Sequence, residues 1–223
     1  MGSSPSAPVE TPEWRAQFVA PAGVDFREEL DASFTGATAL PRKTNIVSWL
    51  PSPSSGVAVK GVALIAHGLH EHSLRYHAVG CAWAADGWAV YSVDHVGHGL
   101  TRFDTPSEHV PGLISSRELV VDDFVHFAAL VRSRHAAELP VFLMGHSLGS
   151  LIALCAAARI PKLRALAISG CAVIPGYGSA SPFGCACLYP VTQTGCGVCL
   201  TGVCNLARRC MESPMIFCVH CAD

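Results

Sequence analysis

Short apolar runs alternate with amphipathic stretches between about residue 60 and residue 170. Each apolar run is continuous and is bounded by glycine, proline or charged residues, which is typical of buried parallel strands. The runs are KGVALIAHG (60–68), WAVYSVD (88–94), LPVFLMG (139–145) and LRALAIS (163–169). The stretches between them predict helices, and these are LRYHAVGCAWAA (74–85), SSRELVVDDFVHFAALVRSRH (115–135) and SLIALCAAARI (150–160). Strands that alternate with helices predict βαβ units and a mostly parallel sheet with helices on both faces.

The pattern changes on both sides of this region. Residues 1–25 are rich in Ser, Pro and Ala and predict a flexible N-terminal arm, and TNIVSWL (44–50) predicts a strand beyond it. No charged residue occurs between Ala165 and Ala207. In the sequence after LRALAIS, only SPMIFCVH (213–220) looks strand-like. We therefore expect an incomplete core over residues 26–175 and a divergent Cys-rich tail over 176–223. In this interpretation the sheet ends at LRALAIS, and the chain is truncated or read in an altered frame after about residue 175.

Composition excludes several classes of protein. Of 223 residues, 50% are hydrophobic and 14% are charged, so the chain can bury a sizeable core. The net charge is -2 and no basic run occurs, which argues against a nucleic-acid partner. The N-terminus lacks the features of a secretory signal, and no apolar window is long enough to span a membrane. MGSSPS does fit the pattern for N-myristoylation, so we expect a cytoplasmic protein with possible peripheral membrane contact. The oligomeric state stays open.

One short segment carries candidate chemistry. In GHSLG (145–149), Ser147 lies between two glycines, after an apolar strand and before an Ala-rich helix. A sharp strand-to-helix turn would expose the Ser147 hydroxyl and place the Leu148 N–H beside a developing negative charge. The alternative is a tight turn in which Ser147 only caps the helix. The Leu69 N–H follows the strand that ends at HGL (67–69), and it would complete an oxyanion hole with Leu148.

Four segments together resemble a known family. They match, in the family's order, the signatures of monoacylglycerol lipases and of the wider serine aminopeptidase (S33-like) α/β-hydrolases. The segments are HGLHEHSLRY (67–76), DHVGHGLT (94–101), LVVDDFVHF (119–127) and PVFLMGHSLGSLIAL (140–154). The resemblance implies an α/β-hydrolase fold, Ser147 as nucleophile, and the Leu69 and Leu148 amides as oxyanion donors. It also implies ester substrates such as monoacylglycerols or lysophospholipids and no cofactor. Thr101 stands where the family usually has Ser.

The sequence departs from the family after the nucleophile. The family's triad takes its Asp and its His from well beyond the Ser, and this chain offers only Glu212, His220 and Asp223 there. PMIFCVHCAD (214–223) resembles the family's acid-bearing strand, which makes Asp223 the candidate acid. No histidine follows it. Of the earlier histidines, His67 and His146 are expected to hold loops at strand ends and His95 and His98 to have a structural role in a loop, and the alternative that an earlier histidine replaces the base stays open. An inactive pseudo-hydrolase or binding module is therefore the alternative to an esterase.

Cysteine placement raises one further alternative. Eight of the 11 cysteines lie between Cys185 and Cys221. Cys196-x-x-Cys199 and Cys218-x-x-Cys221 have the spacing of a zinc site, although chance pairs are expected in so Cys-rich a segment. Zinc binding by the tail is thus an alternative to the favoured interpretation, which has no metal. Disulfides are not expected, because nothing directs the chain to an oxidising compartment.

Overall fold

The computed structural model describes residues 13–31, 42–103, 110–170 and 215–219. The strands are β1 (Val24–Asp31), β2 (Arg42–Pro51), β3 (Gly61–Ala66), β4 (Trp88–Val93), β5 (Arg102–Phe103), β6 (Val141–His146), β7 (Leu163–Ser169) and β8 (Met215–Val219). The α-helices are α1 (His77–Ala85), α2 (Arg117–Ser133) and α3 (Leu148–Ala157). Short 3-10 helices are η1 (Glu13–Gln17), η2 (Pro53–Ser55) and η3 (Ser73–Tyr76).

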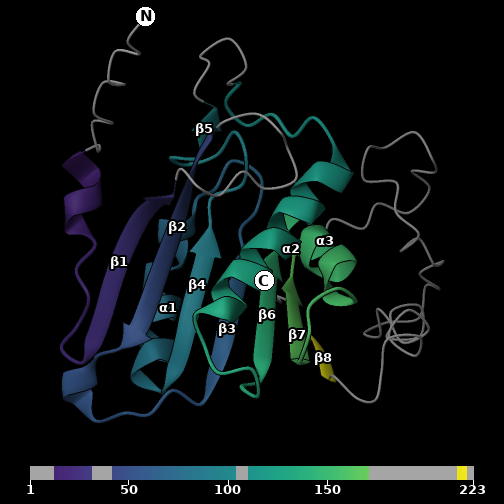
Figure 1. The fold of residues 1–223 in the computed structure, drawn as a ribbon. Helices are drawn as coiled ribbons and strands as arrows, with labels where there is room; N and C mark the ends of the chain where they lie inside the picture. The colour runs from purple at the N-terminus through teal and green to yellow at the C-terminus, as the bar shows by residue number, and fades with distance from the viewer. Residues whose placement is uncertain (1–12, 32–41, 104–109, 171–214, 220–223) are drawn as a thin grey trace, which may run out of the picture.

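The strands form one sheet in the order β1-β2-β4-β3-β6-β7-β8, and β5 pairs with β2 (Figure 1). β4, β3, β6, β7 and β8 run parallel, whereas β2 is antiparallel to both β1 and β4. The predicted mostly parallel sheet is therefore confirmed. In a parallel sheet, the carboxyl ends of the strands share one edge, which is where ligands bind in such folds.

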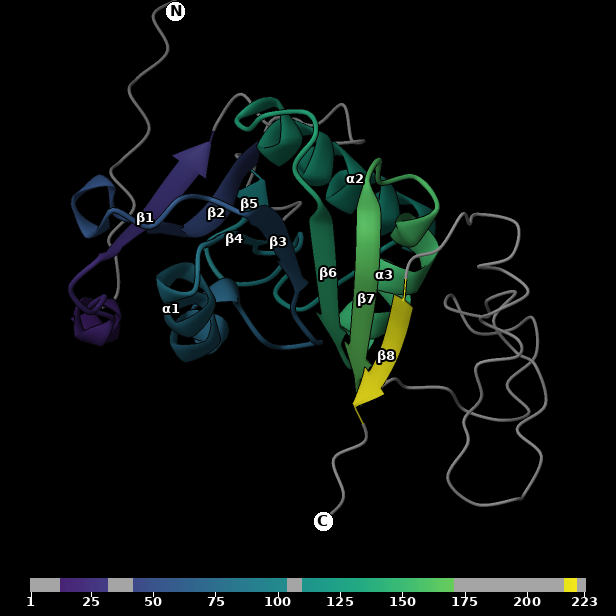
Figure 2. The same ribbon diagram turned by 90° about the horizontal axis from the view of Figure 1, so that it is seen from below.

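Helices cover both faces of the sheet, as the alternating pattern predicts (Figure 2). The side chains of β3 show why, since Val62 and Leu64 join the core under α2 and α3, whereas Ala63 and Ile65 join the core under α1. All of these side chains are fully buried. A strand buried on both faces needs a continuous apolar sequence, which is the feature that identifies β3 in the chain.

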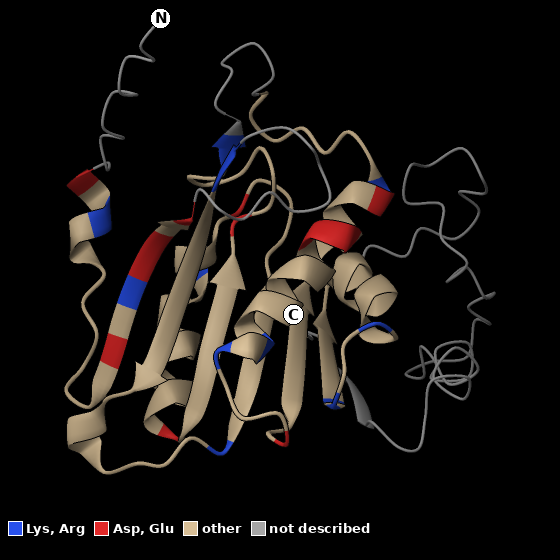
Figure 3. Cartoon of the chain, viewed as in Figure 1, with Lys and Arg blue, Asp and Glu red and all other residues tan. Residues whose placement is uncertain are grey.

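Charged side chains are absent from the central strands and frequent on the edge strand β1 (Figure 3). The sequence of β1 is VDFREELD, whereas β3, β4 and β6 read GVALIA, WAVYSV and VFLMGH. Charges on an edge strand oppose pairing with another chain, so β1 carries a common protection against aggregation.

The predicted flexible arm over residues 1–25 is not free of the core in its described part. Within that part, Arg15 of η1 is 7% exposed and forms an ion pair with Glu28 of β1. Trp14 packs against His72, with ring centroids 5.0 Å apart. Arg15 can be buried because Glu28 compensates its charge, a pairing that Ser-Pro-Ala composition does not reveal. Residues 1–12 lie outside the described part.

The opposite edge of the sheet also differs from expectation. The sequence interpretation ends the sheet at LRALAIS, but β8 pairs in parallel with β7, from Ala165 opposite Met215 to Ser169 opposite Val219. The strand-like segment SPMIFCVH therefore supplies an additional strand. Residues 171–214 and 220–223 lie outside the described residues, and with them the zinc-spaced Cys196, Cys199 and Cys221.

The helices follow the predicted ranges with small differences. The helix predicted over 74–85 begins with the 3-10 turn η3 and becomes α-helical at His77. Ser116 caps α2 by accepting a hydrogen bond from the Leu119 N–H. In the part of the chain that the structure describes, no helix combines the length and the apolar character needed to cross a bilayer.

Candidate active site

Ser147 occupies the turn between β6 and α3, at the carboxyl edge of the sheet. Its backbone has φ 52 and ψ -119, a left-handed φ that costs free energy for a residue with a Cβ. Hydrogen bonds hold this turn, because the Ser147 N–H donates to the Ser169 carbonyl over 2.8 Å and the Ser150 N–H donates to the Ser147 carbonyl over 2.9 Å. The chain therefore reverses abruptly at Ser147, as the strand–serine–helix pattern predicts.

The glycines around Ser147 are required by close backbone contacts. A Cβ at Gly149 would lie 2.0 Å from the Ala66 carbonyl oxygen, and a Cβ at Gly145 would lie 2.3 Å from the Gly149 carbonyl oxygen. No side chain fits at these distances. The first turn of α3 thus packs directly on the end of β3 and brings Ser147 close to the loop that follows β3.

The two predicted oxyanion donors flank this turn. A Cβ at Gly68 would lie 3.3 Å from the Ser147 Cβ, which places the Gly68–Leu69 peptide beside the serine. Leu148 is the first residue of α3, where a backbone N–H has no partner within its own helix. Among the described residues, neither Leu69 nor Leu148 donates its N–H to another group. Both amides are thus available for an anionic oxygen, and their role stays a prediction.

Glu71 fixes the loop after β3, a role that sequence reasoning missed. Its Oε2 accepts hydrogen bonds from the Gly68 N–H and the Tyr76 hydroxyl, each over 2.8 Å. Its Oε1 lies 3.0 Å from Arg75 Nε and 3.9 Å from His146 Nε2. Burial acts to raise the pKa of Glu71, but the Gly68 N–H, the Tyr76 hydroxyl and the charge of Arg75 outweigh it and lower that pKa. Glu71 is thus an anion that fixes the start of the loop after β3 through the Gly68 N–H.

His67 and His95 form a second set of contacts that hold the loop after β3. The backbone N–H of His95 donates to His67 Nε2 over 3.0 Å, and His67 Nδ1 lies 2.8 Å from the Gly68 carbonyl oxygen. The prediction that His67 holds a loop is confirmed, and His95 is its partner from the loop after β4. The spacing of 28 residues between them gave no signal, because only the pairing of β3 with β4 brings the two loops together.

The departure at Thr101 keeps the hydroxyl that the family pattern provides. Thr101 Oγ1 accepts the Asn45 N–H over 2.9 Å, and Thr101 is 1% exposed. Serine and threonine supply the same acceptor, so the substitution preserves this contact between the loop after β4 and strand β2.

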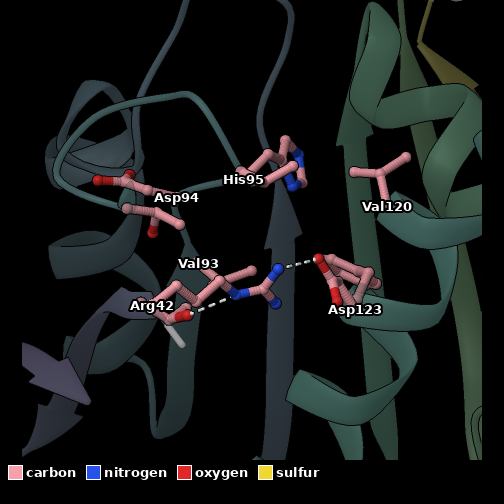
Figure 4. A pocket seen from close by; sticks show the side chains of 10 residues that line it. Arg42, Val93, Asp94, His95, Val120 and Asp123 are labelled. Atoms are coloured by element: carbon pink, nitrogen blue, oxygen red, sulfur yellow. Dashed lines mark hydrogen bonds and ion pairs between the residues drawn. The ribbon is translucent and has the colours of Figure 1, made fainter. Parts of the chain in front are cut away.

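A separate small pocket lies between β2, the end of β4 and α2 (Figure 4). Arg42 crosses it to reach Asp123, with Nη1 2.8 Å from Oδ2, and donates from Nε to Thr44 Oγ1 over 3.3 Å. Asp94 and His95 also line this pocket. It is filled by an ion pair that joins a strand to a helix, which indicates a structural role.

The triad partners of Ser147 are not found among the described residues. Within that part of the chain, no imidazole is hydrogen-bonded to the Ser147 hydroxyl, although His146 precedes it and lies near Glu71. The candidate acid Asp223 lies outside the described residues, as do Glu212 and His220. The described residues also hold no group of three or more metal-ligating side chains. The zinc-spaced cysteines Cys196, Cys199 and Cys221 lie outside the described residues.

Comparison with known proteins gives a consistent set of relatives. The family model described as serine aminopeptidase, S33 matches residues 57–192. The chain is 36% identical to the monoacylglycerol lipase of Mycolicibacterium smegmatis over 115 residues, which are 51% of this chain and 39% of that protein. It is 33% identical to the monoglyceride lipase of Rattus norvegicus over 113 residues, 51% of this chain and 34% of that protein.

A solved structure extends the likeness to three dimensions. The structure titled "Lipase (Open form)" is 26% identical, with a TM-score of 0.54, and the match covers 68% of this chain and 46% of that one. The chain thus spans less than half the length of the curated lipases and of the solved lipase that it matches.

Proposed function

The chain belongs to the serine aminopeptidase S33 family of hydrolases and has the α/β-hydrolase fold, and from this premise we propose that it carries the nucleophile and oxyanion half of a lipase-like serine esterase. Ser147 is the nucleophile of this proposal, and the Leu69 and Leu148 amides are its oxyanion donors. The observation that carries it is the strained turn at Ser147, φ 52, beside two amides that donate to no other group among the described residues. Strain of this kind is retained where function requires it.

The reaction would proceed through an acyl-enzyme. Ser147 Oγ attacks the carbonyl carbon of an ester, its proton passes to a general base, and the carbonyl oxygen becomes an anion held by the two amides. The C–O bond to the alcohol then breaks, and the alcohol leaves with that proton. Water hydrolyses the acyl-serine and releases the acid. Because the described residues place no base on Ser147, we infer low activity for this chain.

Exposed apolar side chains support a lipid-like ester as the substrate. Leu69, Val110 and Leu113 are 49%, 48% and 51% exposed. Their loops are neighbours, since a Cβ at Gly112 would lie 2.5 Å from the His70 ring. An apolar rim that includes Leu69, whose neighbour Gly68 lies beside Ser147, favours an acyl chain over a charged substrate, as in a monoacylglycerol or a lysophospholipid.

A binding module without turnover is the second candidate. It is favoured by the hydrogen-bond pattern, in which no imidazole of the described residues reaches the Ser147 hydroxyl. We keep the division into a hydrolase core over residues 26–175 and a Cys-rich tail over 176–223, with β8 of the tail adding a strand to the core sheet.

A fluorophosphonate probe separates the two candidates. The full chain, Ser147→Ala and a control variant, Ser133→Ala, are incubated with the probe and the labelled site is mapped by mass spectrometry. Ser133 is an exposed serine at the end of α2, so its loss should leave the fold and the labelling unchanged. Labelling that disappears only in Ser147→Ala supports the esterase. A folded wild type that takes no label supports the binding module, and equal labelling of all three proteins excludes Ser147 as the nucleophile.

A further inference from the structure

The Gly68–Leu69 peptide is held by its carbonyl end. In a trans peptide the C=O and the N–H point in opposite directions, so fixing one fixes the other. The Gly68 carbonyl oxygen lies 2.8 Å from His67 Nδ1 and accepts the Glu71 N–H over 3.3 Å. The Leu69 N–H of the same peptide therefore points away from the His67 ring. The peptide lies close to the nucleophile, because a Cβ at Gly68 would lie 3.3 Å from the Ser147 Cβ.

The contacts of His67 determine its tautomer. The backbone N–H of His95 can only donate, and it points at Nε2 of His67 over 3.0 Å. Nε2 of His67 therefore carries a lone pair and no proton. The proton of a neutral ring must then sit on Nδ1, from which it donates to the Gly68 carbonyl. His95 closes the arrangement, because its own Nε2 lies 3.1 Å from the His67 carbonyl oxygen. Both imidazoles are buried.

We propose that neutral His67, with its proton on Nδ1, is a positioning residue that holds the Leu69 amide in place for the oxyanion at Ser147. This inference rests on the proposed function, because it assigns the support of the oxyanion donor. If His67 were protonated, its Nε2–H would point at the backbone N–H of His95, and two donors would face each other. The hydrogen bond that holds the Nε2 edge of the His67 ring would then be lost.

The surroundings of His67 keep it neutral near pH 7. Asp94 and Glu71 favour the charged ring, and His98 opposes it from a ring centroid 5.4 Å away. Burial is the largest effect and lowers the pKa of His67 to about 4. His95, whose ring centroid is 4.0 Å away, is also neutral, because burial lowers its pKa well below the usual value. The tautomer is thus stable over the pH range of an esterase assay.

Two substitutions separate positioning from packing. In His67→Asn the carboxamide NH₂ lies near the position of Nδ1 and still donates to the Gly68 carbonyl. In His67→Gln the longer side chain places its carboxamide near Nε2, so it meets the His95 N–H and releases the Gly68 carbonyl. The readout is the rate constant for fluorophosphonate labelling of Ser147, with melting temperature as the measure of folding.

We expect His67→Gln to lose about 100-fold in labelling rate, the scale of one oxyanion donor, and His67→Asn to stay within about tenfold of wild type. Equal rates in all three proteins overturn the role of His67 while leaving Ser147 as the nucleophile. A wild type without label at Ser147 overturns the proposed function instead.

The tautomer itself is measured on the unmodified chain, which covers the case of a variant that does not fold. Nitrogen-15 spectra of the full chain at pH 7 should show the His67 proton on Nδ1 and none on Nε2. A proton on Nε2, or on both nitrogens, contradicts the proposal.

Discussion

Arg42 Nη1 lies 2.8 Å from Asp123 Oδ2, and this ion pair joins strand β2 to helix α2 inside the protein (Figure 4). The side chains are only 1% and 11% exposed, so removal of Arg42 would take from the buried Asp123 carboxylate the counter-charge that this ion pair supplies. We expect Arg42→Met alone to lower the free energy of unfolding by about 3–5 kcal/mol, measured by urea denaturation.

The double replacement Arg42→Met with Asp123→Leu is the control for this pair. Because it removes both charges, it should recover most of the stability lost in Arg42→Met. A double variant that is no more stable than Arg42→Met would show that the two residues act separately.

Thr101 and Asn45 give a second measurable contact, through the hydrogen bond from the Asn45 N–H to Thr101 Oγ1. Thr101→Val keeps the shape of the side chain and leaves a buried N–H without an acceptor, so it should cost about 2 kcal/mol in unfolding free energy. Thr101→Ser keeps the hydroxyl and should cost less than about 1 kcal/mol. Equal losses in the two variants would mean that the methyl group, and not the hydrogen bond, matters at this position.

The sequence predicts the parts of the fold that depend on residues close together in the chain. The strands β3, β4, β6 and β7 are each recognisable because a strand buried on both faces must be apolar along its length. The turn at Ser147 is recognisable because only small residues fit beside it. These features depend on residues close together in the chain, and the structure confirms the elements they predict.

Features that depend on distant pairing were not predictable. Arg15 is buried only because Glu28 lies opposite it, and β8 becomes a strand by pairing with β7. Likewise, the partnership of His67 with His95 exists only once β3 lies beside β4. For Arg15 and His67 the local sequence carries no signal, because the sheet topology supplies the partner. The sequence of β8 is strand-like, but it does not tell that this strand pairs with β7.

The packing at Gly149 predicts a large effect of a single methyl group. A Cβ at Gly149 would lie 2.0 Å from the Ala66 carbonyl oxygen, so Gly149→Ala must push α3 away from β3. We expect a loss of about 3 kcal/mol in unfolding free energy and loss of labelling at Ser147. Gly56→Ala is the control, because a Cβ there meets nothing within 4 Å and its φ of +68 alone should cost about 1 kcal/mol. Similar losses at both glycines would contradict the close contact between α3 and β3.

The neutrality of His67 predicts a dependence of stability on pH. Burial lowers the pKa of His67 from 6.5 to about 4, so the unfolded chain binds this proton more readily than the folded protein does. The contribution of His67 to stability is therefore complete above about pH 6.5 and decreases as the pH falls towards about 4. The loss should amount to about 1.4 kcal/mol for each pH unit in that range.

His67→Asn isolates this contribution, because it removes the titrating ring and leaves the other acidic and basic groups in place. Urea denaturation at several pH values should show a shallower decline for His67→Asn than for wild type between pH 6.5 and 4. Parallel curves for the two proteins would indicate that folding does not lower the pKa of His67.

The hydrogen bonding of Ser147 leads to a test with an external base. Within the part of the chain that the structure describes, no imidazole is bonded to the Ser147 hydroxyl, and the Leu69 and Leu148 amides donate to no other group. If the base is what limits the reaction, free imidazole should accept the Ser147 proton and raise the rate of fluorophosphonate labelling in proportion to its concentration. Ser147→Ala should show no such increase, which separates the effect from direct reaction of imidazole with the probe. Fast labelling that imidazole does not change would mean that the chain supplies its own base, and the low activity inferred for it would then be wrong.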